Sequence, residues 1–531
     1  MSHADKDKAT PEDKDQVTTS VVDAKYDRDA ELDPTKLELE HIVHAHGLSG
    51  AVTNVDELNQ GFSIPSLMAV ALVLGGAWAA VIQTMSSTII YGGGVVLIYG
   101  LWITGFGFQM IYMSLAEMAS AWPTSSGPQE WAFQLFPARW KRFASYGIAW
   151  ALCMVYLFAT MISTVLEARQ ILGLVAYAVP GYIPTKPQVW ALNAGLCIVS
   201  GVVNIFGIKA MHRLQTFSLV WFCAGFLIWL VAPVAVSPTH AQAKEVFGTV
   251  LNMSGWSDFV ALMISLGSIG VGYGVPDAVT HLAEETSRPH VDIPRAMIAS
   301  PLISLVTATA TSISILFCGV DLLAMATTET GVPYLYFLDH TLGSRAGVIC
   351  LSVIILYSQF MAIFECQLTS SRSLFAFARE GGAFAPKYLG AVHPKLQVPL
   401  WAIVTNVVFC SLFTLILLGS DTALNSLCNS AAGLLGAAYI PLIGMHLLNK
   451  RHLANPGPTH YGRCFGWFCN VAAVVYLSFT LIFYHFPYTY PFDKDTFNYN
   501  IVIVPGLLGL GLLAWFIWGR KSYILHRVTD E

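Results

Sequence analysis

The sequence has too few charged residues for a water-soluble protein of its length. Asp, Glu, Lys and Arg make up 11% of the 531 residues, whereas soluble domains carry roughly 25%. The mean hydropathy is high, at +0.58. Such a composition suits lipid as the solvent, provided that helices or a closed barrel satisfy the polar backbone groups. Soluble folds and nucleic-acid-binding proteins are therefore excluded.

Other absences narrow the function further. The ten cysteines are scattered, and no spacing predicts a metal site or a disulfide framework. Cys464 and Cys469 are the closest pair, at a helix entry, and we expect no metal there. The sequence contains no Walker loop, so we do not expect ATP-driven pumping. We expect no cofactor, and we do not expect the protein to be an enzyme, because no clustered nucleophile–base pair occurs in the sequence.

Residues 1–60 form a polar, acidic segment that is poor in aromatic residues. This composition predicts a disordered tail, and we expect no cleavable signal peptide, so that insertion begins after Gly61. The tail contains the lysines Lys6, Lys8, Lys14 and Lys25. They could be acceptors for ubiquitin, with a ubiquitin ligase recognising the tail, or they could simply belong to a solvated tail.

Long apolar runs predict an all-α integral membrane protein with about twelve transmembrane helices. A helix needs about 20 apolar residues to span a bilayer. The runs are 66–90, 95–118, 143–168, 188–208, 215–236, 258–283, 297–320, 346–377, 398–419, 426–449, 467–487 and 500–519. The proline-broken segment 170–182 is interpreted as a loop or short surface helix.

Basic residues between the predicted spans set the expected topology. Most lie in loops that share a side with both termini, among them Arg139, Arg372, Arg379 and Lys450. Because cytoplasmic loops carry the excess of Lys and Arg, both termini are predicted to be cytoplasmic. The predicted domains are a tail over 1–60, a twelve-helix core over 61–520 and a short tail over 521–531.

Two predicted spans contain glycine-rich interruptions. The first has Gly75, Gly76, Ala77 and Trp78, and the sixth has a run from Gly267 to Asp277 that includes Pro276. Unwound backbone at membrane depth persists only where it lines a cavity or is buried in protein. Transporters with inverted repeats use two broken helices in matching positions. Close helix packing by small residues is the alternative.

Three segments together form a pattern that is specific to one family of membrane proteins. The first is Ser114-Leu115-Ala116-Glu117-Met118-Ala119-Ser120-Ala121-Trp122-Pro123 with Gly127. The second is His281-Leu282-Ala283-Glu284-Glu285 followed by Ile293-Pro294-Arg295-Ala296. The third runs from Ser371-Arg372-Ser373-Leu374 to Arg379 and Gly381, and is continued by His393-Pro394-Lys395 and Val398-Pro399.

These segments resemble the amino acid/choline/GABA permeases of fungi, a family of the amino acid–polyamine–organocation superfamily. The resemblance covers roughly residues 60–520 and implies a five-plus-five inverted repeat with two extra helices. The repeats would span about 61–236 and 258–449, and the extra helices about 467–519. It also implies secondary active transport of small amines or amino acids, coupled to protons. The sequence departs from the family pattern where Gly76 and Ala77 replace polar residues before Trp78, which alters the expected binding pocket.

The interrupted helices suit two kinds of substrate. Freed amides at the half-helix ends can bind a carboxylate and freed carbonyls an ammonium, as a zwitterion requires. A quaternary ammonium donates no hydrogen bond and prefers aromatic faces. The candidate substrate-binding residues are Gly75, Gly76, Ala77, Trp78, Gly270, Gly272, Tyr273, Gly274, Phe360 and Glu365.

Acidic residues inside the spans are candidates for coupling and gating, because such groups are costly in a membrane. Glu117 could carry a proton or form an ordinary ion pair. Asp277 is expected to cap the second half of helix six, with binding of a cationic group as the alternative. Glu365 could pair with a substrate cation or remain a neutral buried acid. An inner-gate network, or a solvated charge cluster, would involve Glu284, Glu285, Arg288 and Arg295.

We therefore expect a proton symporter that imports amino acids, GABA or choline-like amines across the plasma membrane, with the vacuolar membrane as the alternative. A transport-dead nutrient sensor of the same fold is a second possibility, although little chain follows Arg520 to recruit partners. An exporter or vacuolar exchanger is a third. The short connection between spans six and seven argues against a major-facilitator fold.

Overall fold

The computed structural model describes residues 64–207, 211–453, 456–494 and 496–524. The lysines of the predicted ubiquitin site and the predicted terminal tails beyond these ranges lie outside the described residues. Within them the secondary structure is helical, and twelve helical runs are long and apolar enough to cross a membrane. The predicted all-α, twelve-span architecture is confirmed.

The spans follow one another along the chain in these bounds. The first four spans are α4 (Ile64–Gly75) with α5 (Ala77–Ile89); α6 (Gly93–Val95), η2 (Val96–Gly100) and α7 (Leu101–Ala121); α9 (Lys141–Ala178); and α10 (Lys186–Phe206). The next four are α11 (Met211–Val236); α13 (Asp258–Gly270), η4 (Val271–Tyr273) and η5 (Ala278–Glu285); α14 (Pro289–Phe317); and α17 (Arg345–Arg379). The last four are α19 (Leu400–Phe413) with α20 (Ile416–Gly419); α21 (Asp421–Leu448); α22 (Arg463–Phe483); and α23 (Asn500–Ala514), η6 (Trp515–Gly519) and α24 (Arg520–Ser522).

Five short helices connect the spans. They are α8 (Pro128–Leu135), α12 (Ala243–Gly248), α15 (Leu322–Ala326), α16 (Pro333–Leu342) and α18 (Pro386–Leu389). Helix α16 packs on α5, α11 and α17, and therefore rests against three different spans.

The third span is longer than the sequence suggested. Residues 170–178, predicted as a loop or short surface helix, continue α9 without a break, so that this helix has 38 residues. The prediction was wrong because the only proline in the segment, Pro180, stands after the helix has ended at Ala178. Proline removes a backbone donor only where it stands, so the apolar stretch before it can remain helical.

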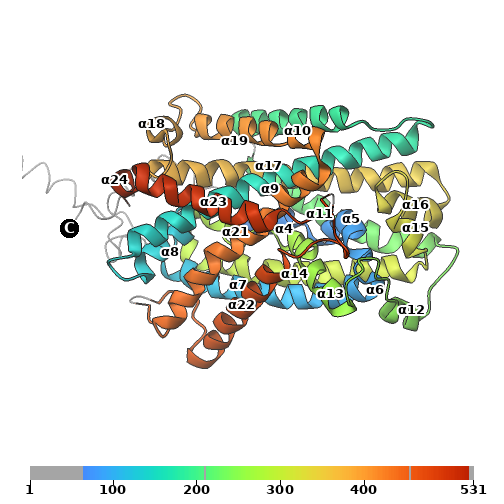
Figure 1. Ribbon diagram of the computed structural model, residues 1–531, viewed down its shortest axis with the longest axis horizontal. Helices are drawn as coiled ribbons and strands as arrows, with labels where there is room; N and C mark the ends of the chain where they lie inside the picture. Colours follow the sequence, from blue (N-terminus) through green and yellow to red (C-terminus); the bar gives the residue numbers. More distant parts are fainter. Residues whose placement is uncertain (1–63, 208–210, 454–455, 495, 525–531) are drawn as a thin grey trace, which may run out of the picture. The chain divides into compact units, whose positions relative to one another are not determined.

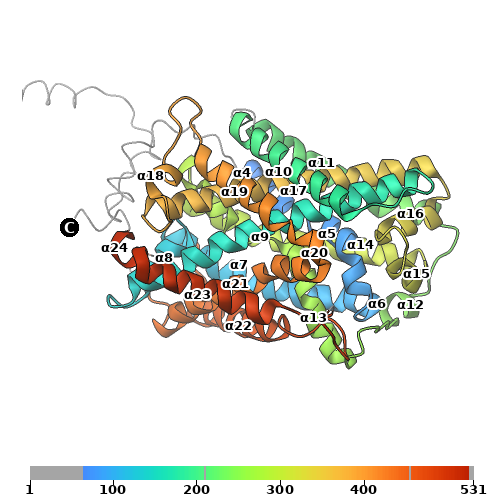
Figure 2. The ribbon, with the colours of Figure 1, turned by 45° about the horizontal axis from the view of Figure 1, so that its top comes forward.

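Helix α9 lies at the centre of the bundle, packed along both α17 and α21 (Figure 1). On one side α10 packs against α19, and on another α7 packs against both α14 and α22. Figure 2 shows α10 and α11 on the side of the bundle away from α22 and α23. The largest buried cluster therefore combines side chains of α7, α9 and α21.

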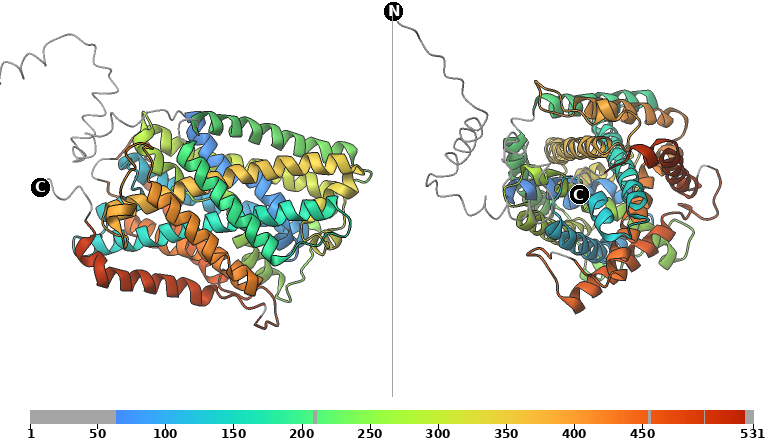
Figure 3. Two further views of the ribbon diagram at one scale, coloured as in Figure 1. Left: turned by 90° about the horizontal axis from the view of Figure 1, so that it is seen from above. Right: turned by 90° about the vertical axis from the view of Figure 1, so that its left-hand side faces the viewer.

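The last helices lie at the periphery, as the end-on view in Figure 3 shows. Helix α23 and the turn after it expose large apolar side chains, including Leu513, Phe516 and Ile517. In water such a surface would be unfavourable, whereas in a bilayer it contacts lipid. The polar groups of the bundle are instead drawn inward, around a cavity between the broken helices and their neighbours.

Candidate functional site

Both predicted helix interruptions are present. In the first span, α4 ends at Gly75 and α5 begins at Ala77, with Gly76 between them at φ 55°. In the sixth span, α13 gives way to a short 3-10 turn and then to Gly274 at φ 66° and ψ −156°. This conformation is essentially restricted to glycine. The prediction that helices one and six are broken is therefore confirmed.

The two interruptions contact each other through their backbones. A β-carbon placed on Gly75 would lie 3.0 Å from the carbonyl oxygen of Gly272. One placed on Gly274 would lie 3.2 Å from Cα of Gly75. Such a close approach leaves little room for a side chain at either position and favours glycine on both sides of the contact. The breaks in helices one and six therefore form one structural unit.

A cavity of about 170 Å³ adjoins this unit. Its walls come from the connecting loops and from α4, α5, α7, α9, α11, α13, η4, α17, α21, α22 and the first residue of α23. Among the described residues that line it, none is Asp, Glu, Lys, Arg or His. Its polar groups are neutral amides and hydroxyls, on Gln83, Thr84, Ser163, Ser218, Ser268, Ser358, Gln359, Asn429, Thr480, Asn498 and Asn500.

Aromatic rings make up much of the remaining wall. Trp221 and Tyr357 form one pair, with ring centroids 4.8 Å apart. The others are Tyr91, Phe108, Tyr156, Phe222, Tyr476, Phe483, Tyr484 and Tyr488. An uncharged cavity with many aromatic faces can hold a cation without a full counter-charge, because the ring faces carry partial negative charge.

The predicted substrate-binding residues are divided between this cavity and its surroundings. Gly75, Gly76, Gly270 and Gly274 line it. A second space of about 10 Å³ is lined by three others, Ala77, Gly272 and Tyr273.

Two predicted aromatic residues do not line either space. Trp78 is fully buried against Phe222, with ring centroids 5.7 Å apart. Phe360 packs onto the cluster formed by Val73, Met361 and Phe364. Both side chains therefore support the walls from behind.

Asp277 lies beside the cavity rather than in its wall. It is completely buried, and the Tyr439 hydroxyl donates a hydrogen bond to its Oδ1. Nε2 of His281 lies 3.7 Å from its Oδ2. The expectation that its side chain caps η5 was wrong, because it makes no capping hydrogen bond. The carboxylate is instead engaged by the Tyr439 hydroxyl of α21.

Glu365 is also buried, within α17. Its carboxyl group accepts hydrogen bonds from Nε2 of Gln215 at 3.0 and 3.3 Å. Gln215 stands on α11, so this contact ties the fifth span to the eighth. Glu365 is therefore separated from the cavity walls and held by a neutral partner.

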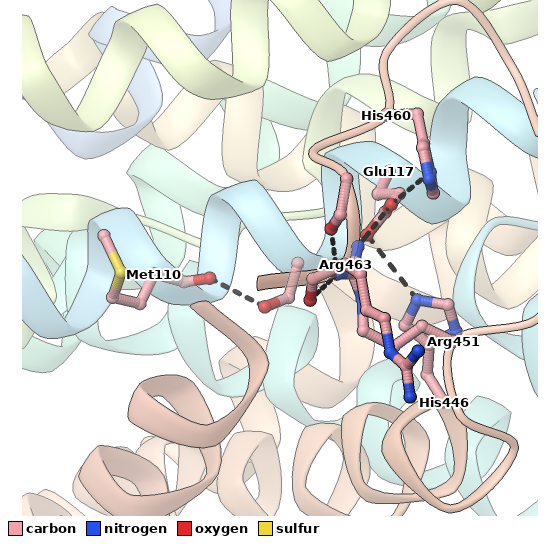
Figure 4. A network of polar contacts seen from close by, with 8 residues as sticks. Met110, Glu117, His446, Arg451, His460 and Arg463 are labelled. Atoms are coloured by element: carbon pink, nitrogen blue, oxygen red, sulfur yellow. Dashed lines mark hydrogen bonds and ion pairs between the residues drawn. The ribbon is translucent and has the colours of Figure 1, made fainter. Parts of the chain in front are cut away.

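Glu117 sits in a network of four charged or ionisable side chains at the end of α7 (Figure 4). Both of its oxygens lie 2.5 Å from Nη2 of Arg451. Nδ1 of His460 lies 2.6 Å from Oε1, and Nε2 of His446 lies 3.6 Å from Oε2. The Arg451 guanidinium also donates to the carbonyl of Gly462. This geometry corresponds to the ion-pair alternative and fastens the loop after α21 onto α7.

The two acids at the end of η5 pair with arginines of α17. Glu285 lies 2.5 Å from Nη1 of Arg372, and Glu284 lies 3.8 Å from Nη2 of Arg379. The Ser125 hydroxyl also donates to Glu284. The partners expected from the sequence were Arg288 and Arg295, and this was wrong. Arg288 instead lies 3.5 Å from Asp292, one turn along α14.

Sequence reasoning missed the cavity residues of α11, α17, α21 and α22. One signal was available in the eleventh span, where Tyr476, Thr480 and Tyr484 recur at intervals of four. Such spacing places polar groups on one face of a helix. In α17 a similar signal is the polar run from Tyr357 to Gln359 within an apolar helix.

Comparison with known proteins gives a consistent answer. The family model described as amino acid permease matches residues 66–508. A choline transporter of Saccharomyces cerevisiae is 29% identical over 88% of this chain and 83% of its own. The amino-acid permease BAT1 of Arabidopsis thaliana is 25% identical over 88% of this chain and 93% of its own. The GABA-specific permease of Saccharomyces cerevisiae is 23% identical over 88% of this chain and 83% of its own. With its twelve apolar spans, the chain is a membrane transporter and belongs to the amino acid permease family.

Proposed function

We propose that this protein imports a small nitrogenous solute through the cavity beside Gly75 and Gly274, driven by protons that enter with it. The observation that carries the proposal is the contact of the two helix breaks at a cavity inside the bundle. Broken helices place free backbone amides and carbonyls at the site, and rocking of one set of helices against the others would open it to each side in turn.

A choline-like amine fits the cavity best. A quaternary ammonium group cannot donate hydrogen bonds, so its binding depends on aromatic faces. The pair formed by Trp221 and Tyr357 offers such faces, and no charged side chain of the described wall competes for the cation. The similarity to a relative named choline transporter supports this choice.

Amino-acid-like zwitterions, GABA included, are the second candidate. The N-terminus of α5 beside Gly76 offers the positive end of a helix dipole to a carboxylate. The side-chain oxygens of Gln359 and Asn429 can accept hydrogen bonds from an ammonium. The relatives named GABA-specific permease and amino-acid permease support this alternative.

Proton coupling is proposed because acidic groups are buried around the cavity without a full set of cationic partners. Glu365 has a neutral partner, Gln215, and Asp277 accepts from a tyrosine. Acids inside a membrane domain are costly unless they exchange protons or pair with cations. We further propose the plasma membrane as the location, with both termini cytoplasmic, and retain the five-plus-five repeat as a prediction.

The substrate is tested by uptake of labelled choline, GABA and a panel of amino acids into permease-deficient yeast that express the chain. We expect saturable uptake of choline, with little competition from GABA. Preferred uptake of GABA or another zwitterion would select the second candidate. If correctly surface-localised protein takes up none of these compounds, the importer proposal is wrong.

A pair of substitutions at Tyr357 separates aromatic recognition from packing. Tyr357→Phe keeps the ring face and should leave choline uptake within about threefold of wild type. Tyr357→Leu removes the face, and a cation–π contact of about 1–2 kcal/mol corresponds to roughly five- to thirtyfold weaker apparent affinity. Equal effects of the two substitutions, at equal surface abundance, would contradict cation binding by this ring.

A further inference from the structure

Glu167 is a buried acid that the cavity walls do not include. It stands on α9, one helical turn beyond the cavity-lining residue Ser163, and only 2% of its surface is exposed. Its Oε2 atom has no hydrogen-bond partner within the described residues. Both polar atoms of Gln170, three residues further along the helix, also lack a partner there. An unsatisfied polar cluster of this kind in a membrane domain needs an explanation.

Helix α16 covers this cluster. A β-carbon on Gly173 of α9 would lie 2.5 Å from the side chain of Val332, which directly precedes α16. Tyr334, in the first turn of α16, is fully buried and its hydroxyl has no hydrogen-bond partner among the described residues. Burial raises the pKa of the Tyr334 phenol, charge on Glu167 raises it further, and Ser352 lowers it. The Tyr334 hydroxyl therefore lies within electrostatic reach of the Glu167 carboxyl group.

The nearby charged groups have other partners. Arg169 of α9 and Lys186 of α10 both contact Asp421, at 2.8 and 2.7 Å. The guanidinium of Arg345, at the start of α17, donates to the carbonyl of Ala178.

The acid and the histidine of α16 are likewise engaged. Asp339 accepts a hydrogen bond from Tyr177, and His340 stacks on Tyr336. Among the residues that the structure describes, no cation forms an ion pair with Glu167.

The arrangement suits a neutral carboxyl group and not an ionised one. A buried carboxylate without a cation is strongly unfavourable, because its lost hydration is not replaced. Helix α16 is bracketed by Gly331 and Gly343, at φ 67° and 58°, and a β-carbon at either position would meet open space. Its two ends therefore have the backbone freedom of hinges.

We propose that Glu167 is the proton-carrying residue of the transport cycle and that α16 is the lid which closes over it once it is protonated. This inference rests on the proposed proton symport. When α16 lifts, external water reaches Glu167 and hydrates its ionised carboxylate. The carboxylate can then bind a proton from this water. When the lid is down, only the neutral form is accommodated, so closure follows protonation. When the cavity opens to the other side, its water reaches Glu167 from Ser163, one turn away, hydrates the carboxylate and takes up the proton.

The test uses the purified full-length protein in proteoliposomes that contain a pH-sensitive dye. Labelled choline and GABA are supplied outside in parallel, and substrate entry and lumen acidification are measured together. In liposomes preloaded with unlabelled substrate, we expect Glu167→Gln to exchange it for labelled substrate within about threefold of the wild-type rate. Without preloading, we expect acidification of the lumen to be reduced at least tenfold. Glu167→Asp, which keeps an ionisable group, should retain acidification. Glu329→Gln removes an exposed acid just before α16 and serves as the matched control.

Two results separate the failure of this inference from that of the proposed function. If wild-type protein carries substrate without acidifying the lumen, proton symport itself is wrong. If wild type acidifies the lumen and Glu167→Gln does so equally, only the role of Glu167 is overturned.

A second measurement avoids the question of whether the variant folds. Dicyclohexylcarbodiimide reacts with protonated carboxyl groups in apolar surroundings, and the modified residue is located in wild-type protein by peptide mass spectrometry. We expect modification of Glu167, with loss of acidification in proportion. Absence of modification at Glu167, or modification that leaves acidification intact, would overturn the proposal.

Discussion

Replacing Glu117 by glutamine should destabilise the protein through the loop that follows α21. The carboxylate has no exposed surface and both oxygens lie 2.5 Å from Nη2 of Arg451, whose side chain is 5% exposed. The substitution leaves the Arg451 guanidinium buried without its counter-charge. Removing one member of a buried ion pair costs about 3–5 kcal/mol.

The backbone around Arg451 adds to this cost. Lys450 and Arg451 both adopt positive φ angles, 54° and 58°, which cost roughly 1–2 kcal/mol for residues with a side chain. The guanidinium holds this conformation by bonding to Glu117 and to the carbonyl of Gly462. When the first contact is lost, we expect the loop to relax and α22 to be less firmly attached to α7.

The expected change can be measured as an apparent melting temperature of the purified protein. The unfolding entropy of a chain this long is about 1 kcal/mol/K, so a loss of about 3–5 kcal/mol lowers the melting temperature by about 3–5 °C. Arg451→Met should lower it less, because His446 and His460 remain beside Glu117.

The double variant Glu117→Gln/Arg451→Met should recover most of the loss, since a buried pair replaced as a whole is close to neutral. Losses that simply add in the double variant would refute the reasoning, because they would mean that the two groups do not act on each other.

Two further predictions concern the break in helix six and the end of α17. Gly274→Ala should cost about 1–3 kcal/mol, because φ 66° with ψ −156° is essentially confined to glycine, and uptake should fall at least tenfold. Gly147→Ala, with open space around it in α9, is the control: it should stabilise the protein by up to about 1 kcal/mol through its helix propensity and leave uptake unchanged. Burial raises the pKa of Glu380 to about 7 from a usual value of 4.5. The native state therefore binds this proton more tightly than the unfolded state, and protonation stabilises the fold. This stabilisation is fully present below pH 4.5 and is lost as the pH rises through 7. Glu380→Gln should therefore raise the apparent melting temperature at pH 8 and not at pH 4.5, and a gain of equal size at both values would contradict the assignment.

The local features of this fold were accessible from the sequence. Apolar runs and flanking polar residues predicted the twelve spans, because hydropathy is a property of each segment by itself. Glycine at positions 76 and 274 predicted the helix breaks for a similar reason, since both residues adopt positive φ angles, which favour glycine. At Gly75 the reason is instead the close contact with Gly272 of the sixth span. The continuation of α9 through Ala178 was missed because Pro180 was given influence over residues before it.

The partners of the polar side chains were not accessible in this way. Glu117 and Arg451 are 334 positions apart in the sequence, and Asp277 and Tyr439 are 162 apart. Such pairs depend on how helices pack, which the composition of neither segment specifies. The neutral, aromatic character of the cavity also depends on how the helices pack. Most of its rings come from α9, α11, α17 and α22 or from loops, and not from the two broken helices.

The most direct test of the central claim is the accumulation ratio of labelled choline in permease-deficient yeast, measured before and after a protonophore is added. Proton-coupled import through the cavity predicts an internal concentration at least tenfold above the external one. It also predicts that this ratio falls to about one with the protonophore and is low throughout in Gly274→Ala at equal surface abundance. A steady ratio near one in untreated cells, or accumulation that the protonophore leaves unchanged, would contradict the claim.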